Sequence, residues 1–305
     1  MAPRLIAVVG PTASGKSDLA LRLAREHAGE IVSCDSLQVY RGLDIGSAKP
    51  TAEERRQVPH HLVDVVAPDE AFSAADYGRL GRKALAGIAE RDRLAVVAGG
   101  AGLYLRALLQ GLFEGPSRDE AFRSRLERLA DHYGDVRLHR VLARVDPKSA
   151  SRIEARDRMR VIRALEVLHA TGRPISAHHA VPAQPLGTFR ILTLGIAPPR
   201  TKLRERVERR TERMLEAGLI DEARGLIARG YGPELRPLRS IGYRQALAVV
   251  RGETDEATAR RDIVAETMRY AKRQMTWFRH QTQALWSPDG ESAHAAATAW
   301  LEANA

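Results

Sequence analysis

The fold is decided by the stretch Leu5-Ile-Ala-Val-Val-Gly10-Pro-Thr-Ala-Ser-Gly15-Lys16-Ser17-Asp-Leu-Ala-Leu-Arg-Leu-Ala24. Its first five residues are a short apolar run typical of a buried strand, and residues 17–24 have the apolar spacing of a helix. Residues 10–17 between them match the pattern G-x-x-x-x-G-K-[ST], at the strand-to-helix position that this motif requires. The stretch therefore predicts a phosphate-binding loop of the P-loop type.

We expect a diphosphate or triphosphate to be bound by the eight residues of this phosphate loop, which are Gly10, Pro11, Thr12, Ala13, Ser14, Gly15, Lys16 and Ser17. Glycines let the backbone wrap around an anion, and the helix N-terminus adds partial positive charge. Lys16 would neutralise phosphate oxygens and Ser17 would ligate Mg²⁺. The motif does not say which phosphate compound is bound.

Further short apolar runs indicate strands at residues 30–34, 94–98 and 188–195. A helical pattern at residues 74–91 separates the first two of these runs, so strands alternate with helices. Such alternation predicts a parallel sheet with right-handed crossovers. We therefore predict an α/β protein with a P-loop NTPase-like core, a parallel sheet and flanking helices.

Residues 114–185 lack any strand pattern and are mostly helical and basic, with helical patterns at 119–132, 136–144 and 147–170. This segment predicts a helical insertion domain within a core formed by residues 1–113 and 186–305. The pattern is helical again over residues 200–280. From residue 287 on, the Ala-rich tail carries few residues suited to chemistry.

The chain of 305 residues carries 48 Lys and Arg against 38 Asp and Glu, a formal net charge of +10 and a pI near 10.1. This balance favours a polyanionic partner such as nucleic acid, with a solvated basic surface as the alternative. The single cysteine, Cys34, excludes a disulfide within the chain and suits a reducing cytoplasm. No apolar run is long enough to cross a membrane.

Most loops of this kind serve ATP or GTP, which makes a kinase of a small metabolite or nucleotide the default hypothesis. The run at residues 94–98, however, leads into Gly99-Gly100 rather than into the Asp that often helps to hold Mg²⁺. The nearest candidate carboxylate is Asp35, which follows another expected strand. Asp35 could be a metal partner, a general base or a turn cap.

Longer strings follow the phosphate loop in order, namely Asp35-Ser-Leu-Gln-Val-Tyr-Arg41, Leu43-Asp-Ile-Gly-Ser-Ala-Lys-Pro50, Pro59-His-His-Leu-Val-Asp64, Gly99-Gly-Ala-Gly-Leu-Tyr104, Arg160-Val-Ile-Arg-Ala-Leu-Glu-Val167, Ser240-Ile-Gly-Tyr-Arg-Gln245 and Tyr270-Ala-Lys-Arg-Gln-Met-Thr-Trp-Phe278. Together they span roughly residues 5–280. In these strings the chain resembles the tRNA dimethylallyltransferase family.

The resemblance implies transfer of a dimethylallyl group from its diphosphate to N6 of the adenosine on the 3′ side of the anticodon in tRNA. It also implies that the phosphate loop holds the prenyl diphosphate, which leaves as diphosphate. The N6 amine is a weak nucleophile, so Asp35 is the expected general base. Lys16, Arg210 and Mg²⁺ at Ser17 are expected to stabilise the leaving group. Arg206 and Arg213 share a helix face with Arg210 and are expected to be solvated.

The resemblance further implies contacts with the anticodon stem-loop of tRNA from Asp35, Ser36, Leu37, Gln38, Ala101, Met159, Arg160, Val161, Ile162, Arg163, Gly242, Tyr243, Arg244 and Arg273. The amide of Gln38 could pair with a base edge. Arg156, Arg160 and Arg163 have the spacing of one helix face, with Val161 and Leu165 on the other side, although a plain surface helix would look the same.

Two segments depart from the family pattern. Ala101 stands where relatives usually carry Thr, which removes a hydroxyl expected near the reacting groups. Residues 153–157 lack the His-Pro-Asn that many relatives carry before the Asp, which puts local contacts of the insertion in doubt.

Several features are expected to be structural rather than catalytic. The adjacent residues His60 and His61 supply too few ligands for a metal and are expected to form hydrogen bonds. Trp277 and Phe278 are expected in the core more than on an RNA-binding surface. We expect a cytoplasmic monomer, and the rival hypotheses are a kinase and a basic RNA-binding protein without activity.

Overall fold

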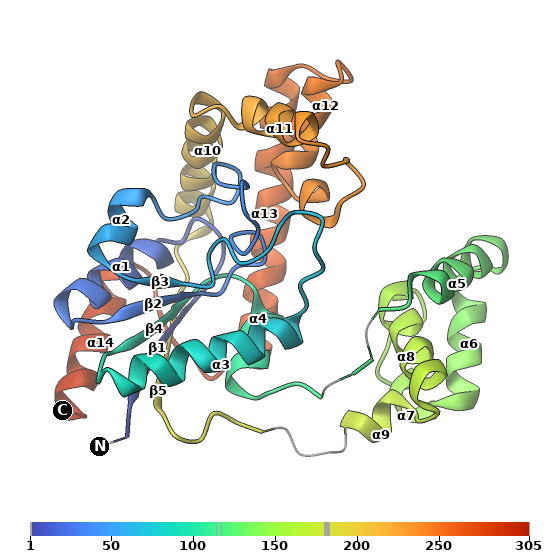
Figure 1. Ribbon diagram of the computed structural model, residues 1–305, viewed down its shortest axis with the longest axis horizontal. Coiled ribbons are helices and arrows are strands. Elements are labelled where there is room, and N and C mark those ends of the chain that lie inside the picture. The colour runs from blue at the N-terminus through green and yellow to red at the C-terminus, as the bar shows by residue number, and fades with distance from the viewer. Residues whose placement is uncertain (1, 114, 117, 180–183, 305) are drawn as a thin grey trace. The chain divides into compact units, whose positions relative to one another are not determined.

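The computed structural model describes residues 2–113, 115–116, 118–179 and 184–304. The chain divides into a larger unit, Met1–Leu109 with Leu186–Ala305, and a smaller unit, Gln110–Pro185 (Figure 1). The residues that flank the smaller unit are joined, because Leu186 N–H donates a hydrogen bond of 2.8 Å to the carbonyl of Leu109. The expected insertion at residues 114–185 falls within the smaller unit.

The larger unit contains a six-stranded parallel sheet in the order β3-β2-β4-β1-β5-β6. Its strands are β1 (Arg4–Val9), β2 (Glu30–Ser33), β3 (His60–His61), β4 (Ala95–Ala98), β5 (Arg190–Ile196) and β6 (Leu285–Ser287). The parallel sheet and its four longer strands confirm the sequence prediction. β1 lies between β4 and β5, so the phosphate loop leaves the carboxyl edge near the middle of the sheet, where α/β proteins bind ligands.

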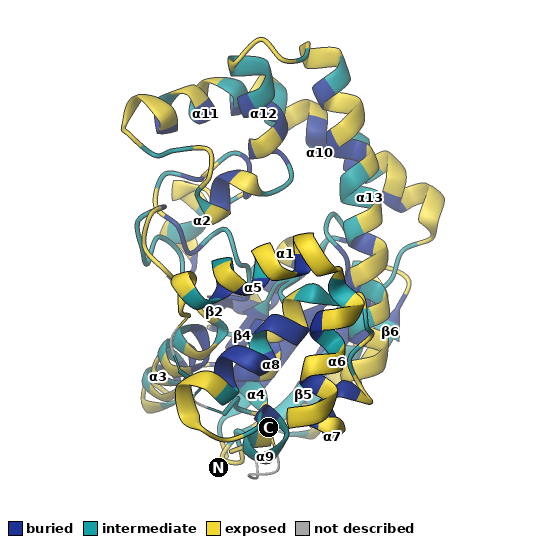
Figure 2. Ribbon diagram, turned by 90° about the vertical axis from the view of Figure 1, so that its right-hand side faces the viewer, coloured by how far each residue is buried: buried dark blue, intermediate teal, exposed yellow. Residues whose placement is uncertain are grey.

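Helices pack on both faces of the sheet, and the strands β1, β2 and β4 are buried along most of their length (β2 and β4 are labelled in Figure 2). The helices of the larger unit are α1 (Lys16–Glu26), α2 (Ala52–Gln57), α3 (Ala74–Glu90), α4 (Gly102–Leu109), α10 (Arg200–Glu216), α11 (Leu219–Ala228), α12 (Tyr243–Val250), α13 (Glu256–Gln281) and α14 (Gly290–Ala303), with a 3₁₀ turn, η1 (Arg236–Arg239). Of these, α10, α11 and α12 lie beyond the carboxyl edge of the sheet (Figure 1). Ile6 and Val8 pack with α1 and α14, whereas Leu5, Ala7 and Val9 pack on the opposite face, with α3, α4 and α13. Successive side chains of β1 thus point to opposite faces of the sheet and belong to two separate hydrophobic cores.

The smaller unit is helical in its described residues and has its own core. Its helices are α5 (Glu120–Tyr133), α6 (Asp135–Val145), α7 (Pro147–Ala150), α8 (Arg158–Thr171) and α9 (Ile175–His179). The core is formed mainly by leucine and other aliphatic side chains of α5, α6 and α8, including Val161 and Ile162. Among the described residues no helix has the length and apolar character needed to cross a membrane.

The single helix expected at residues 147–170 is a wrong prediction. α7 ends at Ala150 and α8 begins only at Arg158, after Asp157, whose carboxylate caps the helix by accepting from the Arg160 N–H at 3.2 Å. Arg156 therefore precedes α8 and does not share a helix face with Arg160 and Arg163. Asp is a favoured N-cap residue because its side chain satisfies a free amide of the first turn.

Sequence patterns missed the two edge strands, β3 and β6, which are two and three residues long. β3 contains the histidine pair, and both rings form hydrogen bonds as expected. His60 Nδ1 lies 2.8 Å from the Val58 carbonyl and His61 Nε2 lies 2.6 Å from Glu30. Glu30 is also bonded by Arg91, so this cluster ties β2 and β3 to the end of α3.

Candidate active site

The phosphate loop connects β1 directly to the first turn of α1. Gly15 is the N-cap of α1 with φ of 97°, a left-handed conformation that favours glycine. Lys16 is buried, and its Nζ donates a hydrogen bond of 2.5 Å to the carbonyl of Pro11 within the loop. Burial, and after it the charge of Arg210, lowers the pKa of Lys16 to about 7. The loop thus holds an ammonium poorly compensated by its surroundings, which is what an anion site requires.

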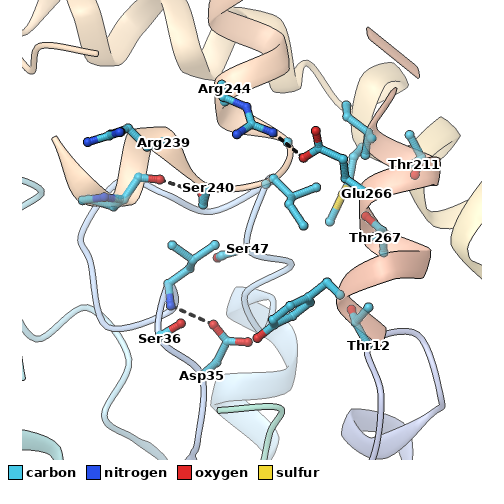
Figure 3. Close-up of a pocket in the computed structure, with 18 of the residues that line it drawn as sticks. Thr12, Asp35, Ser36, Ser47, Thr211, Arg239, Ser240, Arg244, Glu266 and Thr267 are labelled. Carbon is cyan, nitrogen blue, oxygen red and sulfur yellow. Dashed lines mark hydrogen bonds and ion pairs between the residues drawn. The ribbon is translucent and has the colours of Figure 1, made fainter. Parts of the chain in front are cut away.

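The charges of Arg210 and Asp35 act on the pKa of Lys16 in opposite directions, since Arg210 lowers it and Asp35 raises it. Asp35 lies just beyond the end of β2, and its Oδ1 accepts from the Leu37 N–H at 2.8 Å (Figure 3). Arg210 reaches the same place from α10, where burial lowers its pKa and the charge of Asp35 opposes that effect. Lys16, Asp35 and Arg210, all expected to be catalytic, are therefore close enough for their charges to act on one another, although β4 separates β2 from β1 in the sheet.

A cavity of about 590 Å³ opens at this carboxyl edge. Its wall includes Thr12 of the phosphate loop and Asp35 and Ser36 of the loop after β2, with further residues from α10, η1, α12 and α13 (Figure 3). Six arginines line it, which are Arg210, Arg236, Arg239, Arg244, Arg269 and Arg273, against the two acids Asp35 and Glu266. The balance of charges favours a polyanionic ligand.

Part of the same wall is apolar or aromatic. The side chains concerned are Leu37, Tyr40, Phe72, Tyr104, Val207, Met214, Pro237, Ile241, Ile263 and Tyr270. The Phe72 and Tyr104 rings pack edge to face with centroids 6.1 Å apart. A cavity with two carboxylates, six arginines and a partly apolar wall can hold an anion, a short hydrocarbon group and a heterocyclic base.

The chain was compared with known proteins. Residues 38–281 match the family described as IPP transferase. The chain belongs to this family. It is 49% identical over 289 residues to tRNA dimethylallyltransferase 2 of Geotalea uraniireducens, covering 95% of this chain and 93% of that protein. It is also 49% identical to tRNA dimethylallyltransferase of Solibacter usitatus over 286 residues, covering 93% and 92% of the two chains.

Solved structures agree with this IPP transferase assignment. The full-length tRNA isopentenylpyrophosphate transferase of Bacillus halodurans is 38% identical, with a TM-score of 0.70 and coverage of 98% of this chain and 97% of that one. A eukaryotic dimethylallyltransferase acting on tRNA is 26% identical, with a TM-score of 0.76 and coverage of 90% and 70%. The P-loop NTPase-like core predicted from the sequence is therefore confirmed.

Arg206 has a different role from the solvated one expected. Its guanidinium donates a hydrogen bond of 2.9 Å to the carbonyl of Ser14, so α10 braces the phosphate loop of this IPP transferase from outside. Arg213, one turn beyond Arg210, is exposed as expected. Arg206, Arg210 and Arg213 of α10 thus divide into a loop contact, a cavity residue and a surface residue.

The residues expected to contact tRNA divide in the same way within the larger unit. Asp35, Ser36, Leu37, Gly242, Arg244 and Arg273 line the cavity. Tyr243 is fully buried, and its hydroxyl bonds Glu222 at 2.5 Å, so its side chain does not face a ligand. Ala101 is half-buried, and its N–H donates to the Cys34 carbonyl at 3.0 Å.

Gln38 corrects the expectation that its amide meets a base edge. Its Oε1 accepts from the Ser33 hydroxyl at 2.7 Å, and its Nε2 donates to the Ala48 carbonyl at 3.0 Å. Both ends of the amide are thus used within the protein, between β2 and the loop of residues 43–50. The side chain of Gln38 thus holds the segment that follows β2 in place and does not present its amide to the cavity.

In the smaller unit, the side chains of Val161 and Ile162 are buried in the core, as the apolar spacing predicts for Val161, so neither side chain is open to an RNA. Met159 is exposed, and the Arg160 side chain is 70% exposed beside Asp157. Arg163 is tied to the buried carboxylate of Glu166 at 2.6 Å. Of the residues of the smaller unit expected to contact tRNA, Met159 and Arg160 present exposed side chains.

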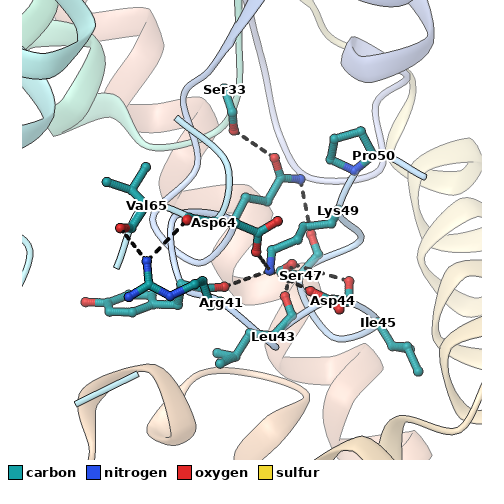
Figure 4. A network of polar contacts seen from close by, with 12 residues as sticks. Ser33, Arg41, Leu43, Asp44, Ile45, Ser47, Lys49, Pro50, Asp64 and Val65 are labelled. Atoms are coloured by element: carbon teal, nitrogen blue, oxygen red, sulfur yellow. Dashed lines mark hydrogen bonds and ion pairs between the residues drawn. The ribbon is translucent and has the colours of Figure 1, made fainter. Parts of the chain in front are cut away.

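The loop of residues 43–50, which supplies Gly46 and Ser47 to the cavity wall, is held by a polar network (Figure 4). The buried Lys49 Nζ donates to the Tyr40 carbonyl at 2.7 Å and to Asp44 and Asp64 at 2.6 Å each. Glu222 of α11 accepts from the N–H groups of residues 44, 45 and 46 at 2.9, 2.8 and 3.2 Å. An otherwise irregular loop is therefore fixed by charged hydrogen bonds.

Ser17 is the expected Mg²⁺ ligand, and it is exposed in the first turn of α1. The part of the chain that the structure describes contains no group of three or more His, Cys, Asp and Glu side chains arranged to hold a metal. A single hydroxyl suits an Mg²⁺ ion that takes its other ligands from water and a diphosphate. The residues present thus fit a metal that arrives with its substrate.

Sequence reasoning missed several cavity residues. Arg236 and Arg239 come from η1, and Arg269 and Tyr270 come from α13. Arg239 directly precedes the string at residues 240–245, and Tyr270 begins the string at residues 270–278. Both strings resemble the family, so the sequence around these two residues pointed to the site. Arg236 carried none, because its approach to the cavity depends on the turn of η1.

Proposed function

We propose that this protein transfers a dimethylallyl group from dimethylallyl diphosphate to N6 of the adenosine on the 3′ side of the anticodon in tRNA, releasing diphosphate. The observation that carries the proposal is the meeting of the phosphate loop, Asp35 and Arg210 at one arginine-lined cavity. The names of the relatives point to the same reaction.

The diphosphate would bind at the phosphate loop, with Lys16 and Arg210 beside it. As the bond from C1 of the allyl group to the diphosphate oxygen breaks, both electrons stay with the oxygen and negative charge builds up on the leaving group. Cations held in a partly buried site stabilise that charge more strongly than they would in water. The apolar wall of the cavity would enclose the five-carbon group.

The N6 amine would attack C1 from the side of Asp35. The lone pair of this amine is delocalised into the adenine ring, so removing a proton as the N–C bond forms lowers the barrier. One carboxylate oxygen of Asp35 is held by the Leu37 N–H at 2.8 Å. The carboxylate is therefore oriented by the backbone and can accept the amine proton, which balances the reaction.

Mg²⁺ would be held through the Ser17 hydroxyl together with diphosphate oxygens and water, and it would supply further neutralisation of the diphosphate. Lys16, Arg210 and the loop amides bind the same anion.

We also propose how tRNA is bound. An adenosine must leave its stack to reach a cavity of this kind, and unstacked loop bases are the usual targets of RNA-binding proteins. Arg244 and Arg273 at the cavity wall would bind phosphates near the target base, and Met159 and Arg160 of the smaller unit would contact other parts of the anticodon arm. The enzyme would act in the cytoplasm as a monomer.

The proposal is tested by incubating the purified protein with Mg²⁺, dimethylallyl diphosphate and unmodified tRNA, followed by mass spectrometry of the digested RNA. We expect a prenylated adenosine that depends on all three components. A parallel reaction with ATP in place of the prenyl donor tests the kinase hypothesis. Consumption of ATP in this reaction, together with no prenyl adduct in the reaction that contains dimethylallyl diphosphate, would refute the transferase.

Binding of tRNA is expected to weaken as the salt concentration rises, since arginines displace counterions from phosphates. Titrations at several salt concentrations measure this slope. An affinity that does not depend on salt would contradict the proposed arginine contacts.

A further inference from the structure

Gln274 bridges two loops at the carboxyl edge of the sheet. It lies on α13 with 6% of its surface exposed. Its Oε1 accepts from the Thr12 N–H of the phosphate loop at 2.8 Å, and its Nε2 donates to the Gly100 carbonyl, after β4, at 2.9 Å. One side-chain amide thus joins the loops that follow two neighbouring strands.

A side-chain amide can make both bonds, because the site needs an acceptor and a donor about one amide group apart. A carboxylate offers only acceptors and an ammonium only donors. The fit also depends on Gly100, since a Cβ there would lie 2.1 Å from Nε2 of Gln274. Gln274 and Gly100 therefore form a matched pair that excludes larger side chains.

The bridge continues to the segment that carries the general base. Ala101, next to Gly100, donates its N–H to the carbonyl of Cys34 at 3.0 Å, and Cys34 directly precedes Asp35. Thr12 and Asp35, at the two ends of this connection, both line the cavity. The phosphate loop and the Asp35 segment are thus linked through Gln274, Gly100 and Ala101, with no ligand required.

We infer that Gln274 is a positioning residue that fixes the phosphate loop relative to Asp35, and hence the leaving diphosphate relative to the attacking amine. This inference rests on the proposed function. The Thr12 N–H is already used by Gln274, so it does not bind the anion itself. The glutamine instead keeps the rest of the loop in its anion-binding shape, and small displacements of reacting groups cost large factors in rate.

The first test is the pair of variants Gln274→Met and Gly100→Ala, one from each side of the bridge. Matched controls are Gln281→Met on the same helix, where the side chain is exposed, and Gly225→Ala in α11, where a Cβ would meet nothing within 4 Å. Affinity for inorganic diphosphate and for tRNA is measured by titration, and turnover is measured with saturating substrates.

We expect both test variants to lose about tenfold or more in diphosphate affinity and in kcat, while tRNA affinity stays within about twofold and the controls match the wild type. Unchanged diphosphate affinity, or equal losses for diphosphate and tRNA, would overturn the inference. Inorganic diphosphate binds without prenyl transfer. If the wild-type protein binds inorganic diphosphate but forms no prenyl adduct, the proposed function is refuted, while the positioning role of Gln274 is still tested by the diphosphate affinities.

Gln274→Glu gives a second test that does not depend on the methionine variant folding well. The carboxylate keeps an acceptor for the Thr12 N–H but sets an oxygen against the Gly100 carbonyl, whereas its protonated form has the donor and acceptor pattern of glutamine. The ratio of variant to wild-type kcat should therefore rise as the pH falls. A ratio that is flat with pH would overturn the positioning role.

Discussion

Replacement of Asp35 by Asn is the sharpest test of the proposed chemistry, because the geometry separates the two roles of this side chain. Asn keeps an oxygen that can accept the Leu37 N–H at 2.8 Å, so the turn after β2 is retained. It loses the negative charge and with it the ability to take a proton from the N6 amine. Asp35→Ala removes both the turn bond and the charge.

General base catalysis contributes about 10²–10⁴-fold to a rate, or roughly 3–5 kcal/mol of barrier. We expect Asp35→Asn to lose a factor in this range in kcat. A turn hydrogen bond contributes about 0.5–1.5 kcal/mol to stability. Asp35→Ala should therefore lower the free energy of unfolding by about that amount, whereas Asp35→Asn should leave it nearly unchanged.

Asp35→Asn should not weaken binding of the prenyl donor, although it lowers kcat. Asp35 is a negative charge close to Lys16 and Arg210. Removing it removes a repulsion of the diphosphate, so the KM for dimethylallyl diphosphate should stay the same or fall while kcat falls. A residue that merely shaped the cavity would raise KM.

The assay is steady-state prenyl transfer at saturating tRNA and varied donor, which gives kcat and the donor KM, with thermal unfolding of each variant measured in parallel. Gln281→Met serves as a surface control. A rate for Asp35→Asn within about threefold of the wild type would show that Asp35 is not the base. A raised KM together with lost tRNA binding would show that its role is confined to the loop.

Three other predictions follow from the contacts described above. Arg206→Ala removes the hydrogen bond to the Ser14 carbonyl and should raise the KM for dimethylallyl diphosphate by about tenfold. Arg213→Ala is the exposed control on the same helix, and equal kinetics of the two variants would contradict the role of Arg206 in bracing the phosphate loop. Glu222→Ala leaves three loop amides without their acceptor and should lower the unfolding free energy by about 1–3 kcal/mol in urea titrations, whereas Asp221→Ala beside it should not. The hydrogen bond from Arg91 is the chief cause that lowers the pKa of Glu30 below 4.5, so the charged side chain stabilises the fold above that pH. The difference in unfolding free energy between the wild type and Glu30→Gln should therefore shrink as the pH falls below about 4.5. A difference that stays constant with pH would refute this prediction.

The central sheet could be predicted because β1, β2 and β4 are buried along most of their length, and these strands and β5 appear in the sequence as short runs rich in apolar and β-branched residues. β3 and β6 could not, since two or three residues give no periodicity. They become strands through their neighbours, with His60 and His61 pairing β2 and residues 285–287 pairing β5. Edge strands of this length are a product of tertiary structure.

The site divides along similar lines. Local motifs indicated the phosphate loop and Asp35, because their chemistry depends on residues adjacent in the chain. The contacts of Arg206 and Gln274 join side chains to backbone groups 192 and 262 residues away. No pattern in the sequence encodes such pairs. The start of α8 was a readable signal that was missed, since Asp157 is a favoured N-cap residue.

The order of strands explains why β4 ends without the carboxylate expected of a nucleotide hydrolase. Asp35 follows β2 and the phosphate loop follows β1, with β4 between them in the sheet. At about 4.8 Å per strand, the proposed base and the diphosphate loop leave the sheet about 10 Å apart, with the Gly99-Gly100 turn in between.

That turn is covered by α13, whose Gln274 and Trp277 lie where Cβ atoms at Gly100 and Gly102 would be. A carboxylate side chain at Gly100 would collide with the bridge from Gln274 and would add negative charge beside the leaving diphosphate. The glycines therefore leave room for a helix that connects the donor loop to the acceptor side. Under the proposed function, the missing carboxylate reflects an enzyme that brings two substrates together across β4 and has no need to activate water at its end.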